Sequence, residues 1–274
     1  MKLVPQAIIL PLLVLTTYSA TATDYQSFIS IGYSKFDNAL SSSDSYGFSS
    51  TYFFDKRSTL GPLNEFEYIN PISNVFAGYA SGDWNDSYRL GGELFINNFL
   101  IAGSYHRIDA DNKKASVDNY DMSLGYLITD DFLVKVTANK VEDVNVFYQF
   151  NAAYNWQLNA NDYIGFTYNT DENFDFHTFS SKYFVALAQE QYLTTSISYI
   201  FTNNGDDFWS VGANFYFNKN SSIFANYAEN DIYSFGAEYY FNKNYALSVR
   251  YSSNSTDKKI TDFDVYSLDF IAQF

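Results

Sequence analysis

The sequence predicts an all-β protein, a transmembrane antiparallel β-barrel of about sixteen strands, with about fourteen to eighteen as the range. Three observations support this fold class. Many segments alternate apolar and polar residues with a period of two, 20% of the 274 residues are aromatic, and short polar turns recur between the segments. A period of two separates the two faces of a strand, so the two faces are expected to meet different media. The mean hydropathy of −0.22 fits such a wall, because each strand averages an apolar and a polar face.

Residues 1–22 are expected to be a cleaved signal peptide, and residues 23–274 an outer-membrane barrel. Lys2 is the only charge in the first segment, Ala7–Leu15 is its apolar core, and Ala20–Ala22 forms an A-x-A cleavage site. The core is too short to cross a bilayer as a helix. No later stretch approaches about 18 uninterrupted apolar residues, so no transmembrane helix is expected.

The sharpest alternation lies in Val146–Leu158, where one face is wholly apolar and the other is mostly amide. This segment exceeds the roughly 9–11 residues that a barrel strand needs to cross a membrane. We expect Tyr148, Phe150, Ala152 and Tyr154 to face lipid. The same reasoning along the chain predicts strands over 25–36, 45–55, 63–70, 74–82, 86–97, 99–109, 117–129, 132–142, 145–158, 163–170, 176–188, 191–201, 207–218, 222–229, 232–242, 245–254 and 262–274.

These segments number seventeen, whereas a bacterial barrel with both termini in the periplasm has an even number of strands. The conflict lies within residues 25–82. Either Asn70–Asn74 is a bulge inside one long strand, or Tyr25–Phe36 lies outside the wall. In both cases the expected number is sixteen.

The connections predict which end of the barrel faces which compartment. Short polar turns, such as Asn97–Asn98 and Asn242–Asn244, alternate with longer acidic loops, such as Asp109–Asp118 and Ser252–Asp262. Short periplasmic turns and longer extracellular loops are typical of outer-membrane barrels. The longest connection expected is about ten residues, so no loop is expected to fold into the lumen and narrow it.

The last strand carries a resemblance of its own. Residues Asp262–Phe274 alternate and end on an aromatic residue, which resembles the closing strand of Gram-negative outer-membrane barrels. The resemblance implies that Tyr266, Leu268, Phe270 and Phe274 form a signal read by the barrel-assembly machinery. A strand of a soluble β-sandwich could also end in Phe, but such strands usually run about 5–6 residues and carry a charged outer face.

A second resemblance lies in Tyr52–Tyr68. This segment resembles the early region of a porin family of Gram-negative bacteria, in which an aromatic strand end precedes Pro-Leu-x-Glu. The matching residues are Tyr52, Phe53, Pro62, Leu63 and Glu65. Phe66 and Glu67 stand where the family pattern has an alanine pair. The resemblance implies an outer-membrane protein that lets small solutes diffuse passively.

The charge balance limits the partners. The formal net charge of −15 makes nucleic acid a poor partner, because such binding rests on cationic contacts to phosphate. Outer-membrane lipid and lipopolysaccharide are the expected surroundings, the latter met through bridging divalent ions. The chain has no Cys and therefore no disulfide framework. No cofactor is expected.

If the apolar face meets lipid, the charged residues of the other face line the lumen. The candidates for ion selectivity are Glu65, Glu67, Arg89, Glu93, Asp121, Lys135, Lys182, Glu238, Arg250 and Asp269. Rings of charge inside a pore set its ion preference, and six acids against four bases predict a weak preference for cations. The same residues could instead pair across strands and merely keep the lumen wet.

Nothing in the sequence predicts an enzyme. A histidine-based centre would have to use His106 or His177, and each is expected to be a rim residue. There is no Gly-x-Ser-x-Gly elbow. Asp109–Asn112 has oxygen-rich spacing, but it lacks the Gly and the distal Glu of a calcium loop, so no metal site is expected.

The function expected from these observations is that of an outer-membrane porin with a water-filled lumen, passing small hydrophilic solutes and ions. A non-conducting barrel for adhesion or envelope integrity is the alternative, and an outer-membrane hydrolase is the remote one. A homotrimer and a monomer are both left open.

Overall fold

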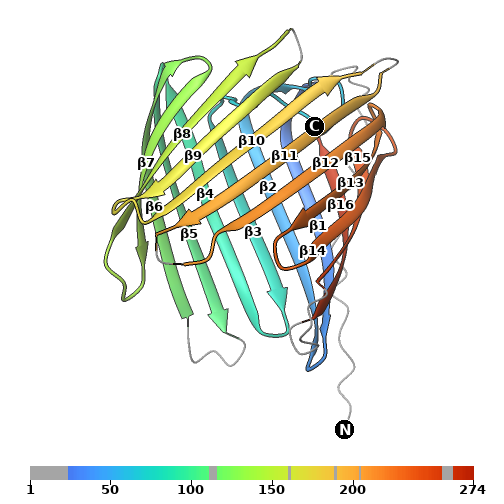
Figure 1. Ribbon diagram of the computed structural model, residues 1–274, viewed down its shortest axis with the longest axis horizontal. Coiled ribbons are helices and arrows are strands. Elements are labelled where there is room, and N and C mark those ends of the chain that lie inside the picture. The colour runs from blue at the N-terminus through green and yellow to red at the C-terminus, as the bar shows by residue number, and fades with distance from the viewer. Residues whose placement is uncertain (1–23, 111–115, 160–161, 188–189, 204, 255–261) are drawn as a thin grey trace.

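The computed structural model describes residues 24–110, 116–159, 162–187, 190–203, 205–254 and 262–274. Over these residues sixteen antiparallel strands form one closed barrel (Figure 1). The described residues contain no helix that is long and apolar enough to cross a membrane. The predicted signal peptide lies outside them. The strands are β1 (Asp24–Asn38), β2 (Ser42–Ser58), β3 (Asn74–Gly82), β4 (Asn85–Ile96), β5 (Phe99–Ala110), β6 (Ser116–Thr129), β7 (Phe132–Val141), β8 (Phe147–Gln157), β9 (Tyr163–Asp171), β10 (Phe176–Ala186), β11 (Tyr192–Thr202), β12 (Phe208–Asn218), β13 (Ser221–Ala228), β14 (Ile232–Tyr240), β15 (Tyr245–Asn254) and β16 (Phe263–Gln273).

The first and last strands close the barrel. β1 pairs with β16 from Phe28↔Gln273 to Asn38↔Phe263, and every other strand pairs with its neighbours in sequence. Closure leaves no row of unpaired backbone groups at an edge, which is the condition for a sheet to cross a hydrocarbon layer.

The two faces of the wall differ as the alternation predicts. On β8, Tyr148, Phe150 and Tyr154 are 46%, 42% and 45% exposed, as are similar aromatic and aliphatic side chains around the barrel. Soluble monomers do not leave so large a continuous apolar surface in contact with water, so this face is covered by lipid. The opposite face of β8 carries Asn151, whose amide donates to the side-chain oxygen of Asn169 on β9. It also carries Asn155, which is buried.

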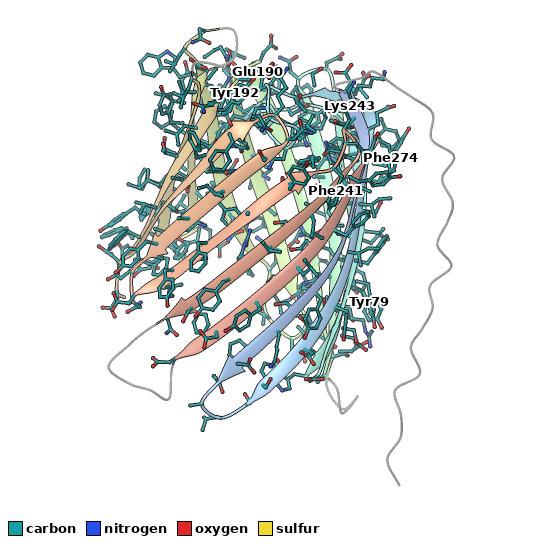
Figure 2. All side chains as sticks on the ribbon, turned by 90° about the vertical axis from the view of Figure 1, so that its right-hand side faces the viewer. Tyr79, Glu190, Tyr192, Phe241, Lys243 and Phe274 are labelled. Carbon is teal, nitrogen blue, oxygen red and sulfur yellow. The ribbon has the colours of Figure 1, made fainter. Side chains whose placement is uncertain are left out.

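The barrel has two distinct ends. Both chain ends of the described wall, Asp24 and Phe274, lie at one end, which we name the termini end; we name the opposite one the far end. Figure 2 shows Glu190, Tyr192, Lys243 and Phe274 gathered at the termini end, whereas Tyr79 lies toward the far end. At the far end, outward-facing tyrosines donate to aspartates in six pairs: Tyr33–Asp44, Tyr79–Asp86, Tyr105–Asp118, Tyr199–Asp207, Tyr227–Asp231 and Tyr251–Asp264.

The number of strands is confirmed, but neither explanation of the parity conflict is correct. Tyr25–Phe36 is part of β1 and belongs to the wall. The segment predicted as a strand over 63–70 is not a wall strand, because β2 ends at Ser58 and pairs directly with β3, which begins at Asn74. Residues 59–73, which we name the lumen loop, leave the wall and fold inside it.

The lumen loop also corrects the predicted distribution of connection lengths. It is the longest connection between two strands, and it lies at the termini end among turns as short as 97–98, 130–131 and 219–220. The expectation that no connection could narrow the lumen is therefore wrong. The far end carries connections such as 142–146 and 172–175, which are only moderately longer than those turns.

Candidate functional site: a barrel lumen narrowed by an internal loop

The lumen loop begins with a compact turn. Leu60 donates its backbone N–H to the carbonyl oxygen of Glu65 at 2.9 Å, and Glu65 donates to the carbonyl oxygen of Pro62 at 3.2 Å. Thr59 and Phe66 form an isolated antiparallel bridge that closes the turn at its base. Gly61 has a φ of 145°, a backbone conformation that residues other than glycine rarely adopt. The ring of Pro62 fixes the φ angle of that residue, so the turn is preformed by its own sequence.

Glu65 is the anchor of the turn. Its side chain is 3% exposed, and Lys182 of β10 lies 2.6 Å from its Oε1 atom. The hydroxyl of Tyr163 donates to the same oxygen at 2.7 Å, and the hydroxyl of Tyr216 donates to Oε2 at 3.3 Å. A buried carboxylate is costly unless it is paired and hydrogen-bonded, and here three donors from three strands satisfy it.

Further contacts spread the attachment over the wall. Leu63 donates its N–H to the carbonyl oxygen of Lys219 at 3.0 Å, and its own carbonyl accepts from the side chain of Gln273 at 3.0 Å. Asn64 donates to Glu238 on β14, and Tyr68 hydrogen-bonds Thr167 on β9. The Leu63 side chain packs with Tyr240, Ala246 and Ile271. The loop is thus fixed against the wall from β9 to β16.

One glycine of the wall and one glycine of the loop allow the loop and the wall to pack closely. A Cβ atom at Gly165 on β9 would overlap the ring of Tyr68, and one at Gly61 would overlap the ring of Tyr192. Tyr68 also packs against the buried cluster of Tyr163, Phe184, Tyr192 and Tyr216. The wall at the termini end is therefore shaped to receive the loop.

The start of the loop is held by a cation. The Arg57 guanidinium lies 4.7 Å from the ring centroid of Phe53 and 4.4 Å from that of Phe66, and Phe28 is 5.8 Å away. Cation–π contacts of this kind strengthen when they are shielded from water. Arg57 therefore joins β1, β2 and the loop, a role that the sequence analysis missed.

The loop contacts identify the inner face of the wall, and the strand register extends the assignment around the barrel. Tyr163, Lys182, Tyr216 and Gln273 face inward, and so do the residues that alternate with them. The apolar residues Tyr266, Leu268 and Phe270 of the last strand fall on the opposite face, 49%, 44% and 42% exposed. Phe274 exchanges backbone hydrogen bonds of 2.9 Å with Ser27 of β1 and so completes the closure.

Two cavities with a polar lining lie on the inner face, and the larger of the two, of about 560 Å³, lies toward the far end. Its wall comes from β1 to β8 and β16, and much of its lining is glycine, serine and asparagine. Charged and titratable lining residues include Arg89, His106, Asp121, Lys140 and Asp269. Ser104 donates to Asp121 at 2.8 Å, and Arg89 lies 4.9 Å from the ring centroid of Phe76. Hydroxyl, amide and charged groups of this kind keep a lumen wetted.

The structure places the ten predicted selectivity residues in three different settings. Glu65 and Glu67 are not on the wall, because both belong to the lumen loop, and Glu65 is neutralised by Lys182. Glu93 accepts from Asn74 at 3.1 Å, Glu238 accepts from Asn64, and Lys135 stands opposite the inward-facing Asn151. Arg89, Asp121 and Asp269 line the larger cavity, and Arg250 lies 5.1 Å from the ring centroid of Phe224.

The two histidines lie on opposite faces. His106 lines the larger cavity, so its prediction as a rim residue is wrong. His177, near the far end of β10, has its Nδ1 atom 2.8 Å from the hydroxyl of Tyr168. No group of three His, Cys, Asp or Glu side chains suited to a metal ion occurs in the part of the chain that the structure describes. Asp111, in the predicted acidic loop, lies outside that part.

A closed barrel with an apolar outer face and a polar lumen defines the class of outer-membrane channel-forming barrels. Residues 1–274 match the family described as "Putative general bacterial porin", and the chain belongs to that family. It is an outer-membrane protein of the Gram-negative type. No curated protein matches the chain significantly.

Solved structures show the same fold at low sequence identity. The outer membrane protein Omp33 of Acinetobacter baumannii has a TM-score of 0.56 and 14% identity, covering 92% of this chain and 99% of that one. A mutant of the Rh. blastica porin has a TM-score of 0.53 and 10% identity over 91% and 99%. CdiB from Acinetobacter baumannii has a TM-score of 0.57 and 9% identity over 91% and 60%.

Proposed function

We propose that this protein is a narrow porin, a passive channel for small hydrophilic solutes and ions with a weak preference for cations. The observation that carries the proposal is the placement of the turn of the lumen loop. The side-chain and backbone hydrogen bonds of Leu63, Asn64 and Glu65 run to β9, β10, β12, β14 and β16, whereas the larger cavity is lined by β1–β8 and β16. A polar path can then run beside the loop along β1–β8.

The loop sets the size of the solutes. Leu63, Glu65 and Tyr68 take up lumen space at the termini end, so the free section there is smaller than the barrel itself. By the orientation typical of such barrels, the termini end faces the periplasm and the acidic far end faces outward. The far-end aspartates support contact with lipopolysaccharide through bridging divalent cations.

The expected cation preference rests on a narrow margin. Once Glu65 and Lys182 cancel, five acids and three bases remain of the ten predicted residues, and the inward-facing Arg57 adds a fourth base. A single charge in excess supports a weak preference only.

A second function is favoured by the same loop. If residues 59–73 fill the lumen completely, the protein is a non-conducting barrel that serves adhesion or envelope integrity. Single-channel recording in planar bilayers separates the two functions. The wild-type chain is compared with a variant in which residues 60–66 are replaced by a short Gly-Ser turn.

Steps of small conductance in the wild type and larger ones in the shortened variant are expected for a porin narrowed by the loop. Conductance in the shortened variant alone would overturn the porin proposal in favour of a plugged barrel. Equal conductance in both would show that the loop does not limit the pore.

A further inference from the structure

A second, smaller cavity lies inside the barrel between the lumen loop and the wall. Its volume is about 300 Å³, and Asn64 of the loop lines it together with residues of β11 to β15. This volume is at the lower end of ligand pockets, so only a small solute fits. The lining is polar: Ser196, Asn214, Asn226, Glu238 and Arg250 are among its residues.

Arg250 supplies a cation that interacts with Glu238 and Asp269 through space but forms no direct ion pair with either carboxylate. Its guanidinium lies over the ring of Phe224, and that ring occupies the space that a Cβ atom at Gly236 would need. The ion pairs among the described residues do not include Arg250. A guanidinium held by its flat face keeps its edge donors for a planar anion such as a carboxylate.

Two acceptors that line the same cavity can each accept a further hydrogen bond. Glu238 accepts from Asn64 through one oxygen, Oε1, which leaves the second carboxylate oxygen. The side-chain oxygen of Asn214 is buried and meets no hydrogen-bond donor within the described part of the chain. Buried acceptors without a donor are costly, so a bound N–H group would stabilise the site.

The strand register sets the spacing of the two charges. Arg250 stands opposite Gly236 and Ser248 stands opposite Glu238, so Arg250 and Glu238 are diagonal neighbours on adjacent strands. Diagonal neighbours on one face are roughly 7–8 Å apart. A molecule with a carboxylate and an ammonium on one carbon can bridge such a gap, whereas a neutral polyol would satisfy neither charge.

We propose that this cavity is a binding site for small zwitterions of the α-amino-acid type, with the carboxylate at Arg250 and the ammonium at Glu238 and Asn214. This inference rests on the proposed porin function and extends it, because it specifies a class of solute that the pore would admit. Asn64 forms part of the site, so the lumen loop takes part in binding as well as in narrowing the pore.

Isothermal titration calorimetry on the detergent-solubilised full barrel tests the site directly, with L-serine as the probe. Glycerol, ethanolamine and glycolate are the controls, since they carry neither charge, the positive charge alone and the negative charge alone. Arg250→Gln and Glu238→Gln should each weaken serine binding by at least about tenfold, the effect of one lost charge-assisted hydrogen bond. Arg107→Gln removes a guanidinium at the far-end rim, where Arg107 pairs with Asp109, and should leave serine binding unchanged.

Absence of serine binding to the wild type, or equal binding of glycerol, would overturn the inference. A loss as large in Arg107→Gln as in Arg250→Gln would also overturn it. Recording in planar bilayers keeps the two proposals apart. Conductance without serine binding would support the porin function and contradict the binding site. Serine binding without conductance would support the binding site and contradict the porin function.

Discussion

At the residue scale, Glu65 is the side chain through which the lumen loop makes most of its polar contacts with the wall. A carboxylate that is 3% exposed has to find its donors where it lies, and Lys182, Tyr163 and Tyr216 provide them. Removing one partner of such a group costs more than the interaction itself contributes, because the other partner stays buried and unsatisfied.

The pairing of Glu65 with Lys182 can be tested by a double-mutant cycle. Lys182→Met should lower the free energy of unfolding by about 1–3 kcal/mol, because Glu65 keeps only its two tyrosine donors. Glu65→Gln in addition should recover part of the loss, since the buried charge is then absent. Urea titration in lipid vesicles measures both. Strictly additive effects would show that the two groups do not act together.

Gly165 is the second residue on which the seating of the loop depends. Gly165→Ala should displace Tyr68, because the added Cβ atom would overlap its ring. The expected results are a higher single-channel conductance and faster chymotrypsin cleavage at Phe66 or Tyr68.

Gly47→Ala is the matched control, because Gly47 also lies on the inner face of a strand and its Cβ atom would meet only the Tyr79 carbonyl oxygen at 4.0 Å. Cleavage and conductance that respond equally to both changes would argue against a specific seat for the loop.

At the element scale, the wall could be predicted from the sequence and the loop could not. A wall strand is recognised because its two faces meet lipid and water, and β8 shows this clearly. Residues 63–70 mix apolar and polar side chains much as a wall strand does, but Leu63, Glu65 and Tyr68 all contact the wall from inside. The mixture comes from packing within the barrel, and no strand pairs with the segment.

Proline was the signal that could have identified the loop. Pro62 and Pro71 are the only prolines after residue 22, and both lie within residues 59–73. Proline cannot donate to a sheet, so this pair limits any strand to the eight residues 63–70 between them, fewer than the roughly 9–11 residues that a wall strand needs. The partners of Glu65 are a different case. Lys182, Tyr163 and Tyr216 are far from Glu65 in sequence, and only the closed barrel brings them together.

The orientation of the β8 side chains toward lipid or lumen can be tested separately. Ala152 stands beside Val134 and Tyr168 on the outer face, and Ala153 stands beside Leu133 and Thr167 on the inner face. Ala152→Arg should cost roughly 2–4 kcal/mol of folding free energy, because it places a charge in the lipid near mid-strand. Ala153→Arg should cost much less, because the lumen is polar. Folding titrations into lipid vesicles compare the two, and equal costs would contradict the facing.

At the scale of the whole molecule, closure depends on the last strand meeting the first. Phe274 bonds Ser27 through both backbone groups, and its carbonyl oxygen also accepts from Gln26. The barrel becomes an edgeless wall only when this pairing forms, so we expect the C-terminal strand to affect assembly as well as stability.

Deleting Phe274 should therefore impair assembly more than the stability of barrels that do form. The resemblance of Tyr266, Leu268, Phe270 and Phe274 to an assembly signal implies the same outcome. Periplasmic accumulation and loss of heat-modifiable migration on gels are the expected results. Normal outer-membrane levels at native expression would remove the support for an assembly signal in these residues.

The ion preference is the property that the whole charge distribution determines. The far-end aspartates, such as Asp206 and Asp207, are in contact with solvent. Their electrostatic effect is therefore screened beyond a Debye length of about 8 Å at physiological salt. Asp121 and Asp269 line the larger cavity, where a permeating ion passes close to them. Asp121→Asn with Asp269→Asn should therefore lower the cation preference more than Asp206→Asn with Asp207→Asn. The reversal potential in a salt gradient measures the preference, which should also fade as the salt concentration rises. An anion-selective wild type, or a larger effect of the rim pair, would contradict the path along β1–β8.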